Sequence, residues 1–311
     1  MTETIIPCPD LDEALEFFTR RLGFRLDMIF PADAPRAAVV SGNGVAIRLE
    51  GPRRADENAR AEPPRVPIIS RVDDAKWISG RAGMQYRDLI PGRLAGRLIG
   101  SHIKVPGGEV ADYVHYHKVA FQMIYCWHGR VRVVYEDQGE PFWLHPGDCV
   151  LQPPEIRHRV LEAAAGTQVI ELTAPADHET WVDHDLRLPT GRVLPERLFG
   201  AQTFVHRKAA ESTIVPEEFG GFESHHFGMT TATGGLAHVS EARAATDNAA
   251  YASDGLNEKS IFLFLFTGRV EITAGAAHRM RFTPGDSILI PPHYRYSLTA
   301  SANSEILRVD I

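Results

Sequence analysis

The sequence contains little cysteine, no long apolar run and no concentrated positive charge. Its 311 residues include three cysteines, which lie far apart and form neither a disulfide framework nor a metal-spaced pair. No apolar run approaches the roughly 20 residues that a membrane helix needs. The formal net charge of −7 argues against a nucleic-acid partner, because phosphate binding needs a concentrated basic face. We therefore expect a soluble protein with neither nucleic acid nor membrane as a partner.

The first residues, MTETIIPCPD, also lack the basic start, apolar stretch and cleavage site of a secretory signal. They favour a cytoplasmic location, in which the cysteines stay reduced. A prior of roughly 100 to 200 residues per domain predicts two or three domains.

Residues 1 to 50 predict a compact βαβββ unit. Asp10 can cap a helix that carries apolar residues at helical spacing and ends at Gly23, and two β-rich runs follow, the second around an Asn-Gly turn. The stretch PDLDEALEFFTRRLGF resembles half of a vicinal oxygen chelate (glyoxalase/bleomycin-resistance) module. That family pairs two such units. We expect this single unit to pack on the rest of the chain or to pair with its copy in a homodimer.

An internal repeat organises the remainder of the chain. Residues 127 to 161 and 266 to 298 share Gly-Arg-Val, then Pro-Gly-Asp, then Pro-Pro, at nearly constant separations. Short strands alternate with Gly/Pro turns in both copies, which predicts a mainly β sandwich or barrel in each. We assign a charged, Pro-rich linker to 51 to 79, a first barrel to 80 to 185, a second linker to 186 to 202 and a second barrel to 203 to 311.

The first copy carries residues that suit a metal ion. His115 and His117 are two apart on a predicted strand, so both imidazoles point to one face. Gln122 begins the next strand, and His158 lies on a third strand after the Pro-Pro turn. A closed barrel can bring all four side chains around one point.

These residues resemble the two motifs of the cupin superfamily. The first motif runs Gly, His-x-His, then Glu and Gly, and Gly108, His115, His117 and Gly129 match it with Gln122 in place of Glu. The second motif runs Gly, Pro-x-Gly and His, and Gly147 and His158 match its ends. The resemblance implies two double-stranded β-helix barrels of the jelly-roll type and a metal ion on His115, His117 and His158. Gln122 would be a fourth ligand or would lie beside the three ligands without binding the ion.

The neutral Gln122 would leave the ion with its full +2 charge, which favours a small anionic organic substrate. Fe(II) is the preferred ion, with Zn, Ni, Mn or Co as alternatives, because sequence does not decide the occupant. With iron, the resemblance implies a dioxygenase acting on an aromatic or diketone-like anion. The alternatives are a non-oxidative lyase, isomerase or decarboxylase, or a non-catalytic small-molecule-binding protein.

Substrate contacts are predicted from alternation alone. Arg97 and Ser101 should share the inward face of their strand with Ile99, Ile103 and Val105. Arg97 could then pair with a substrate carboxylate or with protein carboxylates at the barrel rim. Glu155 and Glu171 are possible acid/base residues, but solvated carboxylates are the simpler interpretation.

The second copy has lost the ligands. Counting back from Gly268 as from Gly129, the four positions fall on Asp254, Leu256, Ile261 and Tyr296. The run IFLFLF predicts an apolar interior, and we expect this barrel to be structural, supporting the first barrel or a dimer interface.

Overall fold

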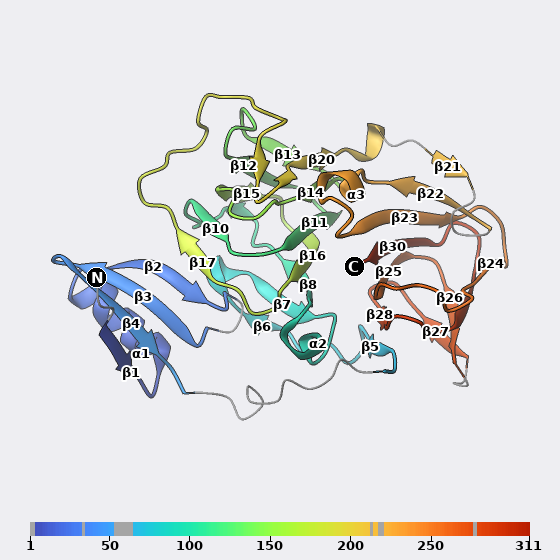
Figure 1. Cartoon of the computed structure of the whole chain (residues 1–311), viewed down its shortest axis with the longest axis horizontal. Coiled ribbons are helices and arrows are strands. Elements are labelled where there is room, and N and C mark those ends of the chain that lie inside the picture. Colours follow the sequence, from blue (N-terminus) through green and yellow to red (C-terminus); the bar gives the residue numbers. More distant parts are fainter. Residues whose placement is uncertain (1–3, 33–34, 53–64, 212–213, 217–220, 276–278) are drawn as a thin grey trace.

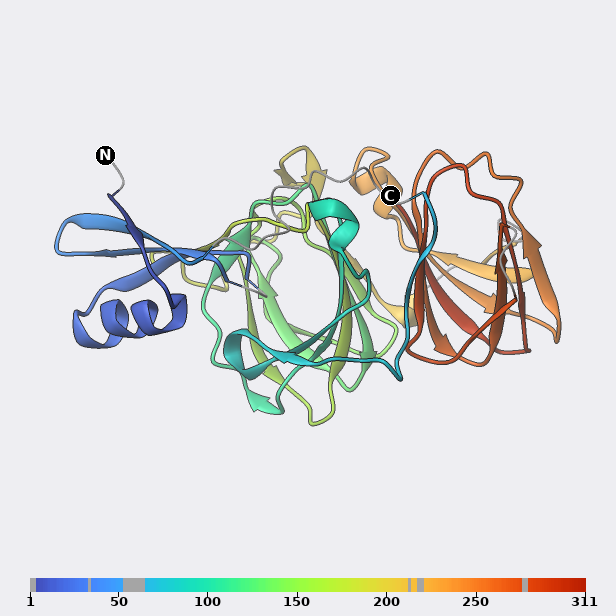
Figure 2. The same cartoon turned by 90° about the horizontal axis from the view of Figure 1, so that it is seen from below.

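The computed structural model describes residues 4–32, 35–52, 65–211, 214–216, 221–275 and 279–311. It is mainly β, as predicted, and forms three units in a row, with the first barrel between the N-terminal unit and the second barrel (Figures 1 and 2). No helix of the described ranges is long and apolar enough to cross a membrane.

The N-terminal unit has the predicted βαβββ order. The Asp10 side chain accepts a hydrogen bond from the Glu13 N–H at 3.0 Å and caps the helix. The helix packs its apolar side on the sheet, and the last turns before Gly23 are π-helical rather than α-helical. The elements are β1 (Thr4–Pro7), α1 (Leu11–Glu16), η1 (Phe17–Arg21), β2 (Arg25–Phe30), β3 (Ala37–Gly42) and β4 (Val45–Glu50).

This unit extends a sheet of the first barrel. Strand β2 pairs with β17 (Thr180–Val182), where Ile29 lies opposite Thr180. An ion pair of 3.0 Å between Arg36 and Asp177 adds a second connection. The unit therefore packs on the barrel, which is one of the two arrangements expected from the sequence. Its resemblance to the vicinal oxygen chelate family stays a prediction.

The first barrel consists of two facing sheets. One runs in the order β1-β4-β3-β2-β17-β10-β15-β12-β13, with β9 beside β15, and the other runs β20-β14-β11-β16-β8-β7-β6. The remaining elements of this region are β6 (Ile78–Ser79), η3 (Arg81–Gly83), β7 (Gln85–Asp88), α2 (Arg93–Gly96), β8 (Ile99–Lys104), β9 (Gly108–Glu109), β10 (His115–His117), β11 (Phe121–His128), β12 (Val131–Tyr135), β13 (Phe142–Leu144), β14 (Cys149–Leu151), β15 (His158–Ala163), β16 (Gln168–Ala174), β18 (Leu198–Phe199), β19 (Gln202–Thr203), β20 (Val205–Arg207) and η4 (Ala209–Glu211).

The second barrel also consists of two sheets, in the orders β21-β22-β23-β30-β25-β28-β5 and β24-β29-β26-β27. Its elements are β5 (Ile68–Ser70), β21 (Ile214–Pro216), β22 (Phe222–His226), α3 (Met229–Ala232), β23 (His238–Ala244), β24 (Ala249–Ala252), β25 (Ile261–Thr267), β26 (Val270–Ala274), β27 (Met280–Phe282), β28 (Ser287–Ile290), β29 (Tyr296–Ala300) and β30 (Glu305–Asp310).

Two strands cross between the barrels. β5 lies in the segment assigned to the first linker but pairs with β28 of the second barrel, and β20, assigned to the second barrel, pairs with β14 of the first. β6, also in the linker assignment, pairs with β7. The pairing thus extends the ordered strands beyond the proposed domain boundaries and ties the two barrels together.

The repeated sequence forms the same turn twice. In each Pro-Gly-Asp turn, a buried aspartate accepts a backbone hydrogen bond from three residues earlier, His145 N–H to Asp148 at 2.8 Å and Thr283 N–H to Asp286 at 2.9 Å. The central glycines, Gly147 and Gly285, have φ values of 88° and 95°, which suit glycine.

The run IFLFLF in β25 serves two cores because successive side chains of a strand point to opposite faces. Ile261, Leu263 and Leu265 fill the interior of the second barrel. The three phenylalanines, 262, 264 and 266, instead pack with residues of the first barrel in the core between the two barrels. The apolar interior is confirmed, and half of the run also joins the two barrels.

Candidate metal centre

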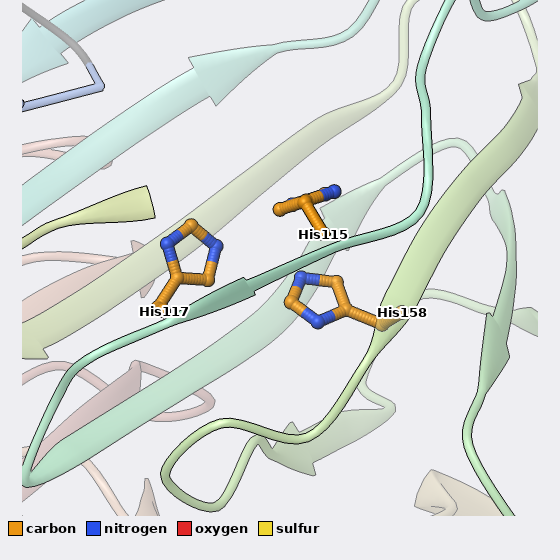
Figure 3. Close-up of side chains that lie close together, drawn as sticks. All are labelled: His115, His117 and His158. Carbon is orange, nitrogen blue, oxygen red and sulfur yellow. The ribbon is translucent and has the colours of Figure 1, made fainter. Parts of the chain in front are cut away.

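Three histidines meet inside the first barrel. His115 and His117 point to the same face of β10, and His158, at the start of β15, lies directly opposite His115 in the antiparallel pair. All three side chains are buried, and one ligand atom from each lies within 4.8 Å of the others (Figure 3). The structure brings together the three histidines that the sequence predicts.

Hydrogen bonds orient each of these rings. The Nδ1 atoms of His115 and His158 lie 2.8 Å and 3.0 Å from the carbonyl oxygens of Tyr113 and Ile156. A carbonyl oxygen only accepts, so Nδ1 carries the proton and the Nε2 lone pair can bind a metal. The Nδ1 of His117 lies 2.8 Å from the Thr180 hydroxyl group, on the strand shared with the N-terminal unit. The donor set fits a divalent transition-metal ion.

A buried carboxylate supports His115. Asp112 lies 3.7 Å from the His115 Nδ1, and its other oxygen accepts the backbone hydrogen bond of Val160 at 2.9 Å. Such a carboxylate near a ligating imidazole raises the basicity of the ligand.

Of the other predicted residues, two lie in the cavity and one does not. Gln122, buried on β11, and Ser101, on β8, line the same cavity as the histidines. Direct ligation by Gln122 stays a prediction. The prediction of an inward-facing Arg97 is wrong, because β8 begins only at Ile99 and alternation does not extend to the exposed Arg97 at the end of α2.

Further polar residues line the cavity. Glu171 faces inward on β16, opposite Ser101, and accepts a hydrogen bond from the Thr173 hydroxyl group at 3.1 Å. Glu171 is therefore half-buried in the cavity, whereas Glu155 is exposed. The alternation of β16 carried the signal, since Val169 and Glu171 share a face.

Sequence reasoning missed Tyr135, Gln152 and His178, which also line the cavity. Burial, followed by the nearby Glu171, raises the pKa of Tyr135, so its hydroxyl group stays protonated. The Tyr135 ring stacks on His158 at a centroid distance of 5.5 Å. His178 lies in the loop after β16, with its ring 5.3 Å from that of His117, and no periodic pattern predicts a loop residue there.

The corresponding region of the second barrel holds no such group. Ile261 and Tyr296 are buried, while Asp254 and Leu256 are exposed in a loop. The Ser253 N–H bonds to Tyr296 O at 2.8 Å, so Ser253, one residue before the counted position, is the closer counterpart of His115. In the described part of the chain, His115, His117 and His158 are the group found with metal-ligand spacing.

The comparison with known families supports the assignment of the first barrel. Residues 101–173 match the family model described as a cupin domain. Residues 101–173 form a cupin domain. The matched residues of this cupin domain extend from β8 to β16 and include the three histidines and Gln122. No curated protein matches the chain.

Solved structures share the cupin fold over both barrels. An oxalate decarboxylase from Lactobacillus farciminis in complex with formate is 13% identical, with a TM-score of 0.57, and the match covers 78% of this chain and 85% of that chain. A Bacillus subtilis oxalate decarboxylase, described with Mn(II) centres, is 11% identical with a TM-score of 0.55, over 83% of this chain and 78% of that chain. Identities this low establish the fold alone.

Proposed function

We propose that the protein is a metal-dependent cupin enzyme that acts on a small anionic substrate, with the ion held by His115, His117, His158 and Gln122. The three imidazoles carry this proposal, because one ligand atom of each lies within 4.8 Å of the others, and the hydrogen bonds at Nδ1 of His115 and His158 leave Nε2 of these rings able to bind an ion. A divalent ion there would act as a Lewis acid on an oxygen atom of the substrate.

The ligand set suits an anion. Three neutral imidazoles and an amide leave the charge of a divalent ion uncompensated, so an anionic substrate completes charge neutralisation on binding. Ser101 and Tyr135 contribute hydroxyl groups to the lining of the cavity, and Glu171 contributes a carboxyl group.

For the reaction, we favour non-oxidative chemistry of the decarboxylase, lyase or isomerase kind over the Fe(II) dioxygenase that the sequence first suggests. The support is the likeness in fold to oxalate decarboxylases, one of them described with Mn(II) centres. Neither the dioxygenase reaction nor a preference for iron has comparable support.

The test is turnover with and without oxygen. Protein freed of metal would be loaded with Mn(II), Fe(II) or Zn(II), and carboxylic acids would be screened while carbon dioxide release and oxygen consumption are followed. We expect turnover that persists without oxygen and is lost in His158→Ala but kept in His293→Ala, an exposed histidine of the second barrel. Stoichiometric oxygen consumption would support the dioxygenase instead. Ligand binding without turnover under every condition would make the protein a binding module.

A further inference from the structure

We propose that the substrate is a monoanion with an apolar body, and that the end of the cavity beyond the histidines receives this body. The inference rests on the proposed function, because the metal is what fixes the anionic group at one end.

The register of one wall places the polar groups at one end. On β12 and β15, Tyr135 lies opposite His158, and two residues further along, Val133 lies opposite Val160. Val131, another two residues on, lies opposite Leu144 of β13. All of these side chains line the cavity, so this wall changes from polar to apolar within three rows.

The opposite wall changes in the same direction. Gln122 and then the row of Ile124, Glu171 and Ser101 give way to Val169 and Ile103, which pair with each other. At the other end, Ala32 of the N-terminal unit joins Ala176 and His178, near His117, in the lining. The histidines therefore lie toward the N-terminal unit, and Val131, Val169 and Ile103 lie toward the far end of the cavity.

The charges of the lining fit one anionic group. Among the described residues that line the cavity there is no lysine or arginine, and Glu171 contributes a carboxyl group. A second carboxylate on the substrate would therefore be buried without a cationic partner and close to Glu171, which is strongly unfavourable. One anionic group at the metal and an apolar remainder avoid this cost.

Comparison with the second barrel indicates that small side chains, and not the fold itself, leave space at the apolar end of the first barrel. At the positions of Val133, Leu144 and Val160, the second barrel has Ile272, Phe282 and Leu298, each of them larger. The hollow in the second barrel has a volume of about 10 Å³, against about 90 Å³ for the cavity of the first. The same fold accepts side chains that occupy most of this space, and the first barrel carries smaller ones.

The experiment measures binding rather than turnover. Protein loaded with Co(II) would be titrated with linear monocarboxylates from acetate to octanoate, and the visible absorption of the ion would report occupancy. We expect affinity to rise roughly fourfold with each methylene until the apolar end is full. Adipate, in which a second carboxylate replaces the terminal methyl group of hexanoate, should bind at least about a hundredfold more weakly than hexanoate.

A variant that carries the residues of the second barrel sharpens the test. Val133→Ile, Leu144→Phe and Val160→Leu together should abolish the rise with chain length while acetate binding and cobalt content persist, and Val160→Leu alone should shorten the series. Val193→Leu, at a position 68% exposed, is the control and should match the parent protein.

The possible outcomes separate the inference from the function on which it rests. If cobalt binds and acetate changes its spectrum, but affinity is independent of chain length or adipate equals hexanoate, the inference is overturned and the proposed metal site stands. If neither cobalt nor any carboxylate binds, the proposed function itself fails.

Discussion

The two barrels share their turns and strand order but differ in what their interiors hold. Both keep the Pro-Gly-Asp turn with its buried aspartate. The first barrel points histidines, Gln122 and Glu171 into a cavity, whereas the second closes around isoleucine, leucine and phenylalanine side chains. The turns and strands that define the fold are therefore compatible with either interior.

The exchange of a few inward positions accounts for this difference. Tyr296 replaces His158 and Ile261 replaces Gln122, and the residues corresponding to His115 and His117 lie in a loop instead of on a strand. The second barrel has no such ligand set, and its Phe262, Phe264 and Phe266 pack against the first barrel. Its inferred contribution is mechanical support for the metal-bearing barrel.

The largest expected effect is a loss of metal affinity, and it distinguishes His158 of the first barrel from its counterpart Tyr296 in the second. His158→Ala should lower metal affinity by more than about a hundredfold, because even residues that only support a ligand are worth 10- to 100-fold. Tyr296→Ala, its counterpart, should cost stability without changing metal affinity. Competition with a chromogenic chelator measures both, and equal losses in the two variants would refute the distinction.

The next largest effect is expected on the free energy of unfolding, when a side chain buried between the two barrels is truncated. Phe264 is fully buried between them, so Phe264→Ala should lower the free energy of unfolding by about 3 to 5 kcal/mol while the metal stoichiometry stays the same. Urea unfolding followed by tryptophan fluorescence measures this change. Leu256→Ala, at a position 75% exposed, is the control and should stay within about 0.5 kcal/mol of the parent. A Phe264→Ala protein as stable as this control would remove the supporting role.

A histidine at the same contact should make stability depend on pH. Burial, followed by the charge of Arg87, lowers the pKa of His102 from 6.5 to about 3. Between these pH values the unfolded chain binds the proton and the folded chain does not. Stability should therefore fall as pH falls from about 6.5, by up to about 1.4 kcal/mol per pH unit, with no contribution above 6.5.

The substitution His102→Gln removes the imidazole that binds this proton in the unfolded chain. Urea unfolding between pH 6 and 4.5 measures the slope of the unfolding free energy against pH. In the variant, this slope should correspond to the uptake of about one proton fewer on unfolding. Identical slopes in parent and variant would show that His102 does not stay neutral between the barrels.

The smallest expected effect concerns the strand shared with the N-terminal unit. Thr180→Val removes the hydroxyl group beside the His117 Nδ1 and should weaken metal binding by about tenfold, without loss of stoichiometry. Thr299→Val, on a strand of the second barrel, is the control. An affinity unchanged in Thr180→Val would mean that His117 needs no support from this strand.

The local patterns of the sequence predicted the elements but not the pairings between distant ones. His115, His117 and His158 could be placed because strand alternation and the repeat fix their directions. The pairing of β2 with β17 and of β5 with β28 joins segments far apart in sequence, and a local hydrophobic period does not predict such pairings. The prediction for Arg97 is wrong because β8 begins two residues later, at Ile99, and His178 was not predicted because it lies in a loop. The predicted homodimer stays a prediction.

An anomalous difference map of the metal-loaded protein, recorded at the absorption edge of the metal, tests the central claim most directly. The account predicts one strong peak per chain, between the Nε2 atoms of His115, His117 and His158, and none in the second barrel. A peak in the second barrel, or none at the histidines of fully loaded protein, would contradict it.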